Sequence, residues 1–338
     1  MTTLGRHLAH PLRVKRLVPE TGDAVSIIFD VPSDLNATYA YRAGQFVTLG
    51  VSLDGEVHHR CYSMSSAPGL GEDLQVTVKR VPGGRVSPWL TTALAEGDTL
   101  TVSPPTGTFV VDEAAGPIVA FAAGSGITPV FSILRSALAA GGRSVRLLYA
   151  NRDFGSAIFA GGLGALATQH PERLCVEHRE DVIHGFVDHA AVAAFVGDVR
   201  DASCYLCGPA PFMVIVETAL LALGVEPERI HVERFTPAPE PVAAEGAVTS
   251  EVFVRLGGRR TAVPHRAGTT LLQSARSAGL KAPSSCELGS CASCMARVLS
   301  GEVTMRTNDV LTPDEVAEGW VLTCQAVPVS STVEVVYE

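Results

Sequence analysis

The sequence lacks an excess of positive charge. Its 26 Lys and Arg residues are outnumbered by 35 Asp and Glu residues, which gives a formal net charge of −9 at pH 7. Nucleic-acid backbones are bound through a positive field, so this composition argues against nucleic acid as the main partner. An acidic surface instead suits a protein partner with a basic docking patch, because opposite fields speed encounter.

Two kinds of apolar segment are also missing. Residues 1–16 contain no apolar run followed by a small-residue cleavage site, so no secretory signal is predicted. The most apolar stretch, 117–131, is interrupted by Gly124, Gly126 and Pro129 and is too short to span a bilayer. We therefore expect a cytoplasmic protein without a membrane segment. In a reducing compartment, clustered cysteines indicate metal or redox chemistry rather than a disulfide framework.

The first part of the chain, residues 1–113, has the pattern of an all-β domain. Short β-branched or alternating runs stand between Gly and Pro clusters, at residues 25–29, 45–49 and 74–79. Such spacing is typical of a sandwich or a small barrel. The whole chain of 338 residues is long enough for two or three domains.

Residues 114–235 change to an alternation of apolar strands and helical patterns. A 3.6-residue period of apolar side chains begins at Val130, and we expect Thr128 to be the N-cap of that helix and Pro129 its first residue. Strands are predicted at 117–122, 145–149 and 202–206. Strand–helix alternation predicts a doubly wound parallel sheet.

A linker and a small third domain complete the chain. Residues 236–247 contain three prolines at alternate positions and no apolar periodicity, which is the composition of an extended spacer. Residues 248–338 return to β patterns. They include a hairpin around Gly257 and Gly258, a helix near 270–278, and final strands near 321–326 and 333–337.

Four cysteines of this third domain have the spacing of an iron–sulfur site. Cys286-x4-Cys291-x2-Cys294 is followed after a long gap by Cys324. A plant-type 2Fe–2S cluster takes three thiolates from one tight loop and the fourth from a distant segment. Small residues around the first three cysteines suit a loop that wraps a cluster and aims backbone N–H groups at its sulfurs: Ser284, Ser285, Gly289, Ser290, Ala292 and Ser293.

The alternatives for these four cysteines are a zinc site or no metal at all. Zinc sites usually combine paired short spacings or histidines, and this region has no second short pair. Among the remaining cysteines, Cys204 and Cys207 form a CxxC pattern at the end of a buried strand, where core packing is preferred over a redox pair. Cys175 is also expected in the core of a strand.

Two segments of the first domain suit a flavin nucleotide. Arg60-Cys-Tyr-Ser63 offers a cation for a phosphate, an aromatic ring to stack on the flavin and a hydroxyl for its reactive ring nitrogen. Downstream, Gly83, Gly84 and Ser87 belong to a glycine-rich turn leading into a helix, which exposes backbone N–H groups to a phosphate. Each segment alone also fits an ordinary turn, and only their combination favours the flavin interpretation.

The second domain carries two turns of the nucleotide-binding kind. The segment 122–129 follows a buried strand and opens a helix, although Pro129 stands where the full dinucleotide fingerprint has its third glycine. Cys207-Gly-Pro209 ends a later strand, and open α/β sheets bind ligands beyond the carboxyl ends of their strands. Both turns are candidates for a nicotinamide nucleotide, with an ordinary turn as the alternative.

Taken in order, these motifs resemble those of ferredoxin–NAD(P)H reductase-type flavoproteins with a C-terminal plant-type ferredoxin domain. The resemblance covers nearly the whole chain. Its motifs are Arg60-Cys-Tyr-Ser63, Gly124-Ser-Gly-Ile-Thr-Pro129, Tyr149-Ala-Asn-Arg-Asp153, Cys207-Gly-Pro209, His231-Val-Glu233 with Phe235, and the cysteine set. The final segments 308–311, 322–325 and 333–337 are similar to those of reductase components of 3-ketosteroid 9α-hydroxylases, and phenylacetyl-CoA epoxidase reductases look similar too.

The resemblance implies three domains: an all-β flavin-binding barrel in 1–113, an α/β nicotinamide-binding domain in 114–235, and a β-grasp 2Fe–2S ferredoxin domain in 248–338. It implies FAD, with FMN less favoured. Residues implied at the flavin nucleotide are Arg60, Cys61, Tyr62, Ser63, Thr77, Val78, Lys79, Gly83, Gly84, Ser87 and Phe235. Residues implied at the nicotinamide nucleotide are Gly124, Thr128, Cys207, Gly208 and Pro209. Ser63, Cys207 and Glu233 are expected to act at the reacting rings.

The implied activity is that of an NAD(P)H-dependent oxidoreductase. A hydride passes from NADH, or alternatively NADPH, to the flavin, and single electrons pass through the cluster to a separate oxygenase. The expected partner is a Rieske-type steroid hydroxylase, with a di-iron hydroxylase or epoxidase as the alternative. The motifs also leave open an electron-transfer subunit of a larger dehydrogenase complex, or a non-enzymatic metal-stabilised binding module. The dehydrogenase subunit is disfavoured because the fourth cysteine in such chains closely follows the third.

Two further positions carry specific expectations. Ala292 stands in the cysteine loop where relatives usually have glycine, so a positive φ there would strain it. Arg152 and Asp153 follow the second strand of the middle domain, near where the adenosine ribose binds in such folds. Arg152 suits a 2′-phosphate and Asp153 suits free hydroxyls, and the resemblance favours NADH.

Overall fold

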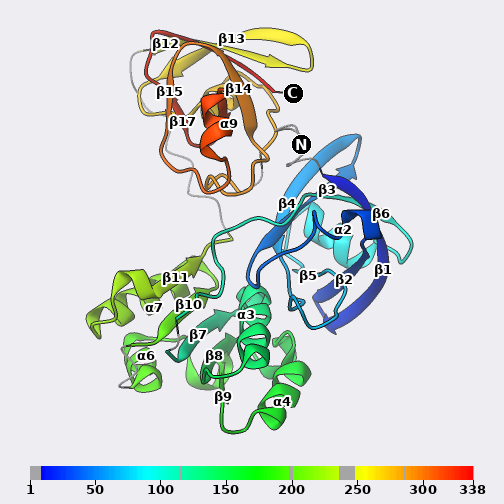
Figure 1. Cartoon of the computed structure of the whole chain (residues 1–338), viewed down its shortest axis with the longest axis vertical. Helices are drawn as coiled ribbons and strands as arrows, with labels where there is room; N and C mark the ends of the chain where they lie inside the picture. Colours follow the sequence, from blue (N-terminus) through cyan, green and yellow to red (C-terminus); the bar gives the residue numbers. More distant parts are fainter. Residues whose placement is uncertain (1–8, 115, 198–200, 236–247, 285, 338) are drawn as a thin grey trace.

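The computed structural model describes residues 9–114, 116–197, 201–235, 248–284 and 286–337. Its sheets gather in three parts of the chain (Figure 1), which we call the barrel, the α/β domain and the C-terminal domain. The predicted linker, 236–247, lies outside the described residues.

The barrel is a six-stranded antiparallel sheet in the order β4-β3-β6-β1-β2-β5. Its two outer strands meet where Met64 pairs with Val76, which closes the sheet around an apolar core. The elements are β1 (His10–Thr21), β2 (Ala24–Asp30), η1 (Ser33–Leu35), β3 (Phe46–Leu53), β4 (Glu56–Ser63), β5 (Gln75–Lys79), α2 (Val86–Thr92) and β6 (Thr99–Val102).

The α/β domain is a five-stranded parallel sheet in the order β11-β10-β7-β8-β9, with α3 and α4 packed on one face and α6 and α7 on the other. The chain winds outward from β7 in both directions, so the carboxyl ends of β7 and β10 lie side by side. The strands are β7 (Ile118–Ala123), β8 (Val145–Asn151), β9 (Leu174–Glu180), β10 (Ser203–Cys207) and β11 (Ile230–Glu233). The helices are η2 (Gly124–Gly126), α3 (Ile127–Ala140), η3 (Phe154–Ser156), α4 (Ala160–Gln169), α5 (Asp181–His184), α6 (His189–Val196), α7 (Ala210–Ala222) and η4 (Pro227–Arg229).

The C-terminal domain has a mixed sheet in the order β13-β12-β18-β14-β16 and a two-stranded sheet of β15 and β17. Helix α8 begins after a capping box between Thr270 and Gln273 and contacts β13 and β17. The elements are β12 (Val248–Leu256), β13 (Arg259–Arg266), α8 (Leu271–Ser277), β14 (Met295–Ser300), β15 (Val303–Met305), α9 (Pro313–Ala317), β16 (Trp320–Leu322), β17 (Ala326–Pro328) and β18 (Thr332–Val336). The predicted hairpin and helix are confirmed here.

The predicted start of helix α3 is wrong. The chain forms a 3-10 turn at 124–126 first, and the helix begins at Ile127 with Gly126 as its N-cap. Thr128 therefore lies inside the first turn, where its hydroxyl donates to the carbonyl oxygen of Ser125 at 3.0 Å. The two glycines allow the backbone to bend into the helix earlier than a Thr-Pro cap would.

Two further local predictions are wrong. Cys175 is exposed rather than in the core, because β9 is the outer strand of its sheet and one of its faces is open. The strand expected at 321–326 is interrupted after Leu322 by a turn, which separates β16 from β17. That turn contains Cys324, so this predicted cluster ligand lies in a turn between two strands and not within a strand.

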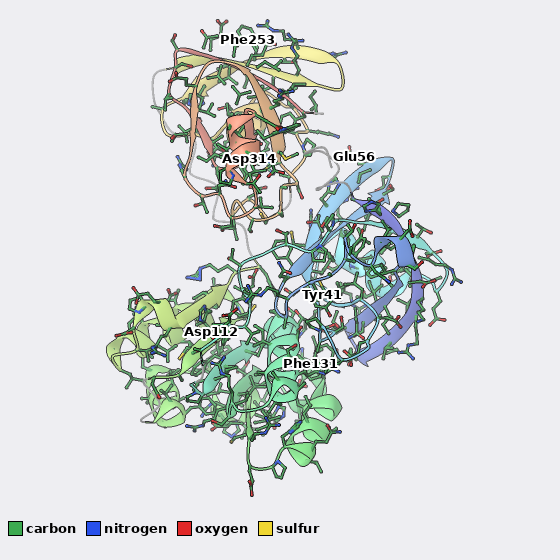
Figure 2. The ribbon with its side chains drawn as sticks, in the orientation of Figure 1. Tyr41, Glu56, Asp112, Phe131, Phe253 and Asp314 are labelled. Atoms are coloured by element: carbon green, nitrogen blue, oxygen red, sulfur yellow. The ribbon has the colours of Figure 1, made fainter. Side chains whose placement is uncertain are left out.

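The barrel and the α/β domain are joined by a buried contact. Ser132 of α3 donates its hydroxyl to the carbonyl oxygen of Ser66 at 2.6 Å, and Arg135 forms an ion pair with Glu72. Ala24, Ala43 and Phe109 belong to the same buried apolar cluster as the residues of α3. Figure 2 shows Tyr41 and Phe131 on the two sides of this contact.

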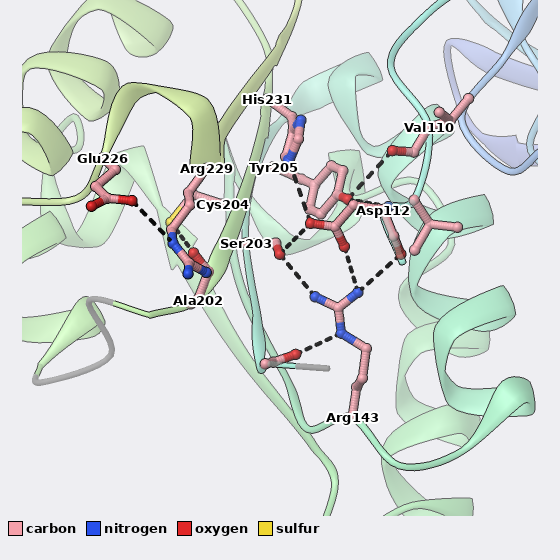
Figure 3. Close-up of polar contacts among 12 residues, drawn as sticks. Val110, Asp112, Arg143, Ala202, Ser203, Cys204, Tyr205, Glu226, Arg229 and His231 are labelled. Atoms are coloured by element: carbon pink, nitrogen blue, oxygen red, sulfur yellow. Dashed lines mark hydrogen bonds and ion pairs between the residues drawn. The ribbon is translucent and has the colours of Figure 1, made fainter. Parts of the chain in front are cut away.

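A network of polar contacts, which we call the clasp, stabilises the segment that connects these two domains (Figure 3). It is formed by Asp112, Gly116, Arg143 and Ser203. Arg143 donates from Nε to the carbonyl oxygen of Gly116 at 2.6 Å, and from its two terminal nitrogens to Asp112 at 2.6 Å and Ser203 at 2.9 Å. The Ser203 hydroxyl donates to the second carboxylate oxygen of Asp112 at 2.5 Å. Burial opposes ionisation of Asp112, but the hydrogen bonds from Ser203 and Arg143 prevail and hold its pKa below the usual range.

Replacing Arg143 by Met is expected to destabilise the protein by about 2 kcal/mol, because Asp112 loses its cation while remaining partly buried. Because the pKa of Asp112 is lowered in the folded protein, its carboxylate contributes to the free energy of unfolding. That contribution is fully present above the unfolded pKa of about 3.9 and is lost as the pH falls through the folded pKa. Thermal unfolding should show a lower midpoint for Arg143→Met at pH 7 and a smaller difference below pH ~4. The exposed Arg16→Met is the matched control, and a difference that does not change with pH would contradict this account.

Candidate functional site

The segment Arg60-Cys-Tyr-Ser63 forms the second half of β4. Alternate residues of a strand point to opposite faces, so Arg60 and Tyr62 share one face and Cys61 and Ser63 the opposite one. Tyr62 packs against the barrel core, and Ser63 is 4% exposed. Cys61 pairs across the sheet with Thr48 of β3. The motif is thus divided between two faces, with Cys61 directed away from its neighbours Arg60 and Tyr62.

Lys79, at the end of β5, lies close to the first turn predicted to bind the nicotinamide nucleotide. Its ammonium lies 3.9 Å from the carboxylate of Asp23. A Cβ placed on Gly124 would lie 3.8 Å from the same ammonium, so Lys79 faces the turn that follows β7. A cation between two segments predicted to bind phosphates suits diphosphate groups.

The side chains of Thr77 and Val78 are occupied elsewhere. The Thr77 hydroxyl lies 2.7 Å from the hydroxyl oxygens of Ser26 and Ser65, and the side chain of Val78 is buried in the barrel core. A nucleotide beside β5 would therefore meet the backbone of these two residues rather than their side chains.

The glycine-rich turn before α2 needs its glycines. Gly83 has a φ of 72°, which is in the left-handed region, and a Cβ on Gly84 would lie 3.1 Å from the carbonyl oxygen of Val81. The buried hydroxyl of Ser87 accepts a hydrogen bond from the Val81 N–H at 3.0 Å. These contacts fold the turn tightly onto the start of α2.

The turns after β7 and β10 meet at close range. A Cβ on Gly126 would lie 2.1 Å from the carbonyl oxygen of Cys207, so only glycine fits there. A Cβ on Gly208 would lie 3.0 Å from the Cβ of Ala123, and Pro209 is the N-cap of α7. The Tyr149 hydroxyl donates to the carbonyl oxygen of Gly124 at 3.2 Å, a contact that sequence reasoning missed although Tyr149 belongs to a recognised motif.

The thiols of Cys204 and Cys207 behave as core side chains, as predicted. Both are fully buried and neither is in a disulfide. Burial raises the pKa of Cys204 to about 12 and that of Cys207 well above its ordinary value, so neither forms the thiolate that redox exchange requires.

Glu233 lies where the three domains meet. It pairs with Cys207 across β10 and β11, and a cavity of about 290 Å³ beside it is lined by Phe46 of the barrel and by Leu288 and Ser290 of the C-terminal domain, among others. Burial, reinforced by the nearby Cys286 sulfur, raises the pKa of Glu233 to about 8. Phe235, two residues further on, is 44% exposed.

The four cysteines with iron–sulfur spacing lie close enough together to shift the pKa of one another's thiols. Cys291 raises the pKa of Cys286, and Cys324 raises that of Cys294. Backbone N–H groups point at two of the sulfurs: Leu288 N–H at Cys286 and Cys286 N–H at Cys291, both at 3.4 Å. Four neighbouring thiols, two of which accept backbone N–H groups, fit a 2Fe–2S cluster, which takes four protein thiolates.

Three domain families match successive parts of the chain. Residues 12–111 match the oxidoreductase FAD-binding domain, 121–218 the oxidoreductase NAD-binding domain, and 254–329 the 2Fe-2S iron-sulfur cluster binding domain. The solved structure of phthalate dioxygenase reductase is similar in fold, with a TM-score of 0.64 and 26% identity over 97% of this chain and 98% of that one. The expected three-domain fold is confirmed.

Two curated relatives are similar over their full lengths. The ferredoxin reductase component of 3-ketosteroid-9-alpha-monooxygenase from Mycolicibacterium smegmatis is 42% identical over 99% of this chain and 98% of its own. A component of the 1,2-phenylacetyl-CoA epoxidase of Escherichia coli is 38% identical over 97% of this chain and 98% of its own.

The chain belongs to this family of oxygenase reductase components. It is an oxidoreductase with FAD, NAD and 2Fe–2S domains that passes electrons to an oxygenase, as expected from the sequence. Among the described helices of this reductase, none combines the length and apolar character needed to cross a membrane.

Hydrogen bonds and an ion pair to Glu287 and Cys294 stabilise the conformation of the cysteine loop in this reductase. Arg276 forms an ion pair with Glu287, and the Gln325 side-chain amide donates to the carbonyl oxygen of Glu287 at 2.8 Å. Thr323 donates its N–H and its hydroxyl to the carbonyl oxygen of Cys294, at 3.1 and 2.9 Å. These supporting roles were not predicted, although Thr323 and Gln325 lie in the segment 322–325, one of those that carried the family resemblance.

Ala292 has the strained backbone that the sequence suggested. Its φ is 55°, in the left-handed region that favours glycine. An L-residue in this region costs about 1–2 kcal/mol relative to glycine. The loop of the reductase therefore stores strain at a position between two predicted ligands.

Replacing Ala292 by Gly is expected to relieve about 1 kcal/mol of this strain and so to slow loss of the cluster on heating with a chelator, followed by visible absorbance. Ala296→Gly is the matched control, because Ala296 is buried in the extended strand β14 and the same substitution should there accelerate loss. Faster loss from Ala292→Gly than from the wild type would show that the loop does not store strain at this residue.

Proposed function

We propose that this reductase supplies electrons from NADH to a Rieske-type 3-ketosteroid 9α-hydroxylase. The observation that carries the proposal is the full-length similarity, at 42% identity, to a reductase component whose name states this steroid oxygenation. The similarity to a component of phenylacetyl-CoA epoxidase makes a di-iron oxygenase the competing partner.

The proposed roles follow the expected site residues. In the barrel, for which we propose the bounds 1–113, Arg60, Lys79 and the turn at 83–87 would hold the flavin nucleotide, with Tyr62 and Ser63 at its ring. In the α/β domain, 114–235, the turns at 124–128 and 207–209 would hold the nicotinamide nucleotide. In the ferredoxin domain, 248–338, Cys286, Cys291, Cys294 and Cys324 would hold the cluster. When bound, FAD accepts a hydride and the cluster carries single electrons.

Four residues have proposed roles at the junction of these sites: Cys207, Gly208, Glu233 and Ser63. The backbone of Cys207 and Gly208 would line the nicotinamide pocket, because the Cys207 side chain is buried and Gly208 has none. Glu233 lies beside Cys207 with a raised pKa, so near neutral pH it can hold or release a proton next to the reacting rings. Ser63 offers a buried hydroxyl from the barrel side.

Turnover with purified oxygenases tests the proposed partner. The reductase and NADH are mixed with a Rieske-type 3-ketosteroid oxygenase and its steroid, or with a di-iron phenylacetyl-CoA oxygenase and its thioester. Hydroxylated steroid is the expected product, formed much faster than epoxide. Efficient epoxide formation without steroid product would contradict the proposal and identify the di-iron oxygenase as the partner.

A preference for NADH is proposed from the ion pair between Arg152 and Asp153. Arg152 Nε lies 2.7 Å from a carboxylate oxygen of Asp153, so the cation that suits a 2′-phosphate is already neutralised. The second carboxylate oxygen of Asp153 accepts from the N–H of Ser156 at 2.9 Å, which fixes the carboxylate at the end of β8.

Replacing Asp153 by Asn is expected to raise kcat/KM for NADPH about tenfold, because it frees Arg152 and removes a like charge while keeping the hydrogen bond to Ser156. Steady-state reduction of ferricyanide with each nucleotide measures the change. Asp188→Asn is the matched control, since Asp188 also caps a helix through an N–H, that of Ala191 at 2.8 Å. If the ratio of kcat/KM for NADPH to that for NADH is unchanged in Asp153→Asn, Asp153 does not select between the two nucleotides.

A further inference from the structure

A chain of hydrogen bonds connects the residue after β18 to the segments of two proposed cluster ligands. The hydroxyl of Tyr337 donates to the hydroxyl of Thr323 at 2.8 Å. That hydroxyl in turn donates to the carbonyl oxygen of Cys294 at 2.9 Å, and the Thr323 N–H donates to the same oxygen at 3.1 Å. Because Thr323 directly precedes Cys324, the chain of hydrogen bonds joins the segment of one proposed ligand to that of another.

The Tyr337 hydroxyl sets the direction of this chain. A hydroxyl carries one proton, so Thr323 gives its proton to Cys294 while its oxygen accepts the proton of Tyr337. Thr323 is fully buried, so bulk water does not reach it. Removal of the Tyr337 hydroxyl would therefore take a donor away from a buried oxygen, which is unfavourable.

Tyr337 is fixed on its own side as well. Its N–H donates to the carbonyl oxygen of Arg255 in β12 at 2.9 Å, and its side chain is 8% exposed and belongs to the apolar core of the ferredoxin domain. The hydroxyl is thus presented to Thr323 by a side chain that is held in place by the sheet and by the core.

The contacts between the ferredoxin domain and the barrel use other residues. Thr106 donates its hydroxyl to the carbonyl oxygen of Ser290 at 3.1 Å, and Lys281 forms an ion pair with Glu56, which Figure 2 labels. Tyr337 lines the cavity of about 780 Å³ between the two domains. Removal of its hydroxyl leaves both of these contacts in place, so its effect is confined to the ferredoxin domain.

We propose that Tyr337 is a positioning residue for the 2Fe–2S cluster: its hydroxyl orients that of Thr323 and so holds the carbonyl of Cys294 against the turn that carries Cys324. Residues that orient metal ligands from behind typically contribute about 10- to 100-fold to metal binding. The inference rests on the proposed ligands Cys294 and Cys324, and it is independent of which oxygenase receives the electron.

The test follows loss of the cluster from the full-length holoprotein to a chelator by visible absorbance, together with the EPR spectrum of the reduced cluster. Tyr337→Phe keeps the ring in the core, and Thr323→Val keeps the shape of the side chain. Each is expected to lose the cluster about tenfold faster than the wild type and to change the EPR g values, because the ligands are less well oriented. Thr323→Ser keeps the hydroxyl and is expected to stay within about twofold of the wild type.

The double variant Tyr337→Phe/Thr323→Val distinguishes a relay from two independent contributions. Because Tyr337 acts through Thr323, the double variant is expected to lose the cluster at the rate of Thr323→Val alone, about tenfold faster than the wild type. Loss about a hundredfold faster, the product of two independent effects, would overturn the proposal.

Tyr39→Phe is the matched control. Tyr39 is also buried, and its hydroxyl donates to the carbonyl oxygen of Val102 at 2.7 Å, within the barrel. Its rate of cluster loss and its EPR spectrum are expected to match the wild type. The proposal is overturned if Tyr337→Phe matches the wild type in both measurements, or if Tyr39→Phe changes both as much. The reduced-cluster signal of the wild type tests the ligand set by itself, and no oxygenase is present, so the proposed function is tested separately.

Discussion

One spatial constraint governs this reductase: the carboxyl ends of β7, β10 and β11 have to lie close to both the barrel and the cysteine loop. Glu233 shows how closely the three domains approach one another. It pairs with Cys207 and lines a cavity with Phe46, and the sulfur of Cys286 helps to raise its pKa. The approach of β7 to β10 is close enough that Gly126 and Gly208 have no room for a side chain. The glycines that look like a phosphate fingerprint are therefore also required by the packing of the sheet.

The two domain contacts of the chain differ in physical character. The barrel and the α/β domain share a buried apolar cluster, and the clasp of Arg143 and Asp112 fixes the connection between them. The ferredoxin domain contacts the barrel through polar groups, among them a hydrogen bond and an ion pair, beside a cavity. Apolar burial makes the first pair a single unit, whereas polar contacts of the second kind exchange easily with water. A domain that has to meet the flavin and then another protein is better served by the second kind of contact.

The presence of a 2Fe–2S domain and the backbone strain at Ala292 could be predicted, because cysteine spacing and turn chemistry are local properties of the sequence. The position of Cys175 could not be predicted, because an apolar strand pattern does not say which strand is outermost.

The prediction that Thr128 caps helix α3 was wrong for a different reason. A 3-10 turn precedes the helix, whereas capping preferences describe a helix that begins directly after an extended residue. The contact of Thr106 with Ser290 was beyond prediction, since it joins residues of two domains whose docking no local pattern encodes.

The most direct test of the account is anaerobic reduction of the purified holoprotein by NADH, followed at once by visible absorbance and EPR. The predicted result is bleaching of the flavin together with the EPR signal of a reduced 2Fe–2S cluster in the same chain. Bleaching of the flavin without that signal would show that electrons do not cross from the barrel to the ferredoxin domain, and would contradict the account.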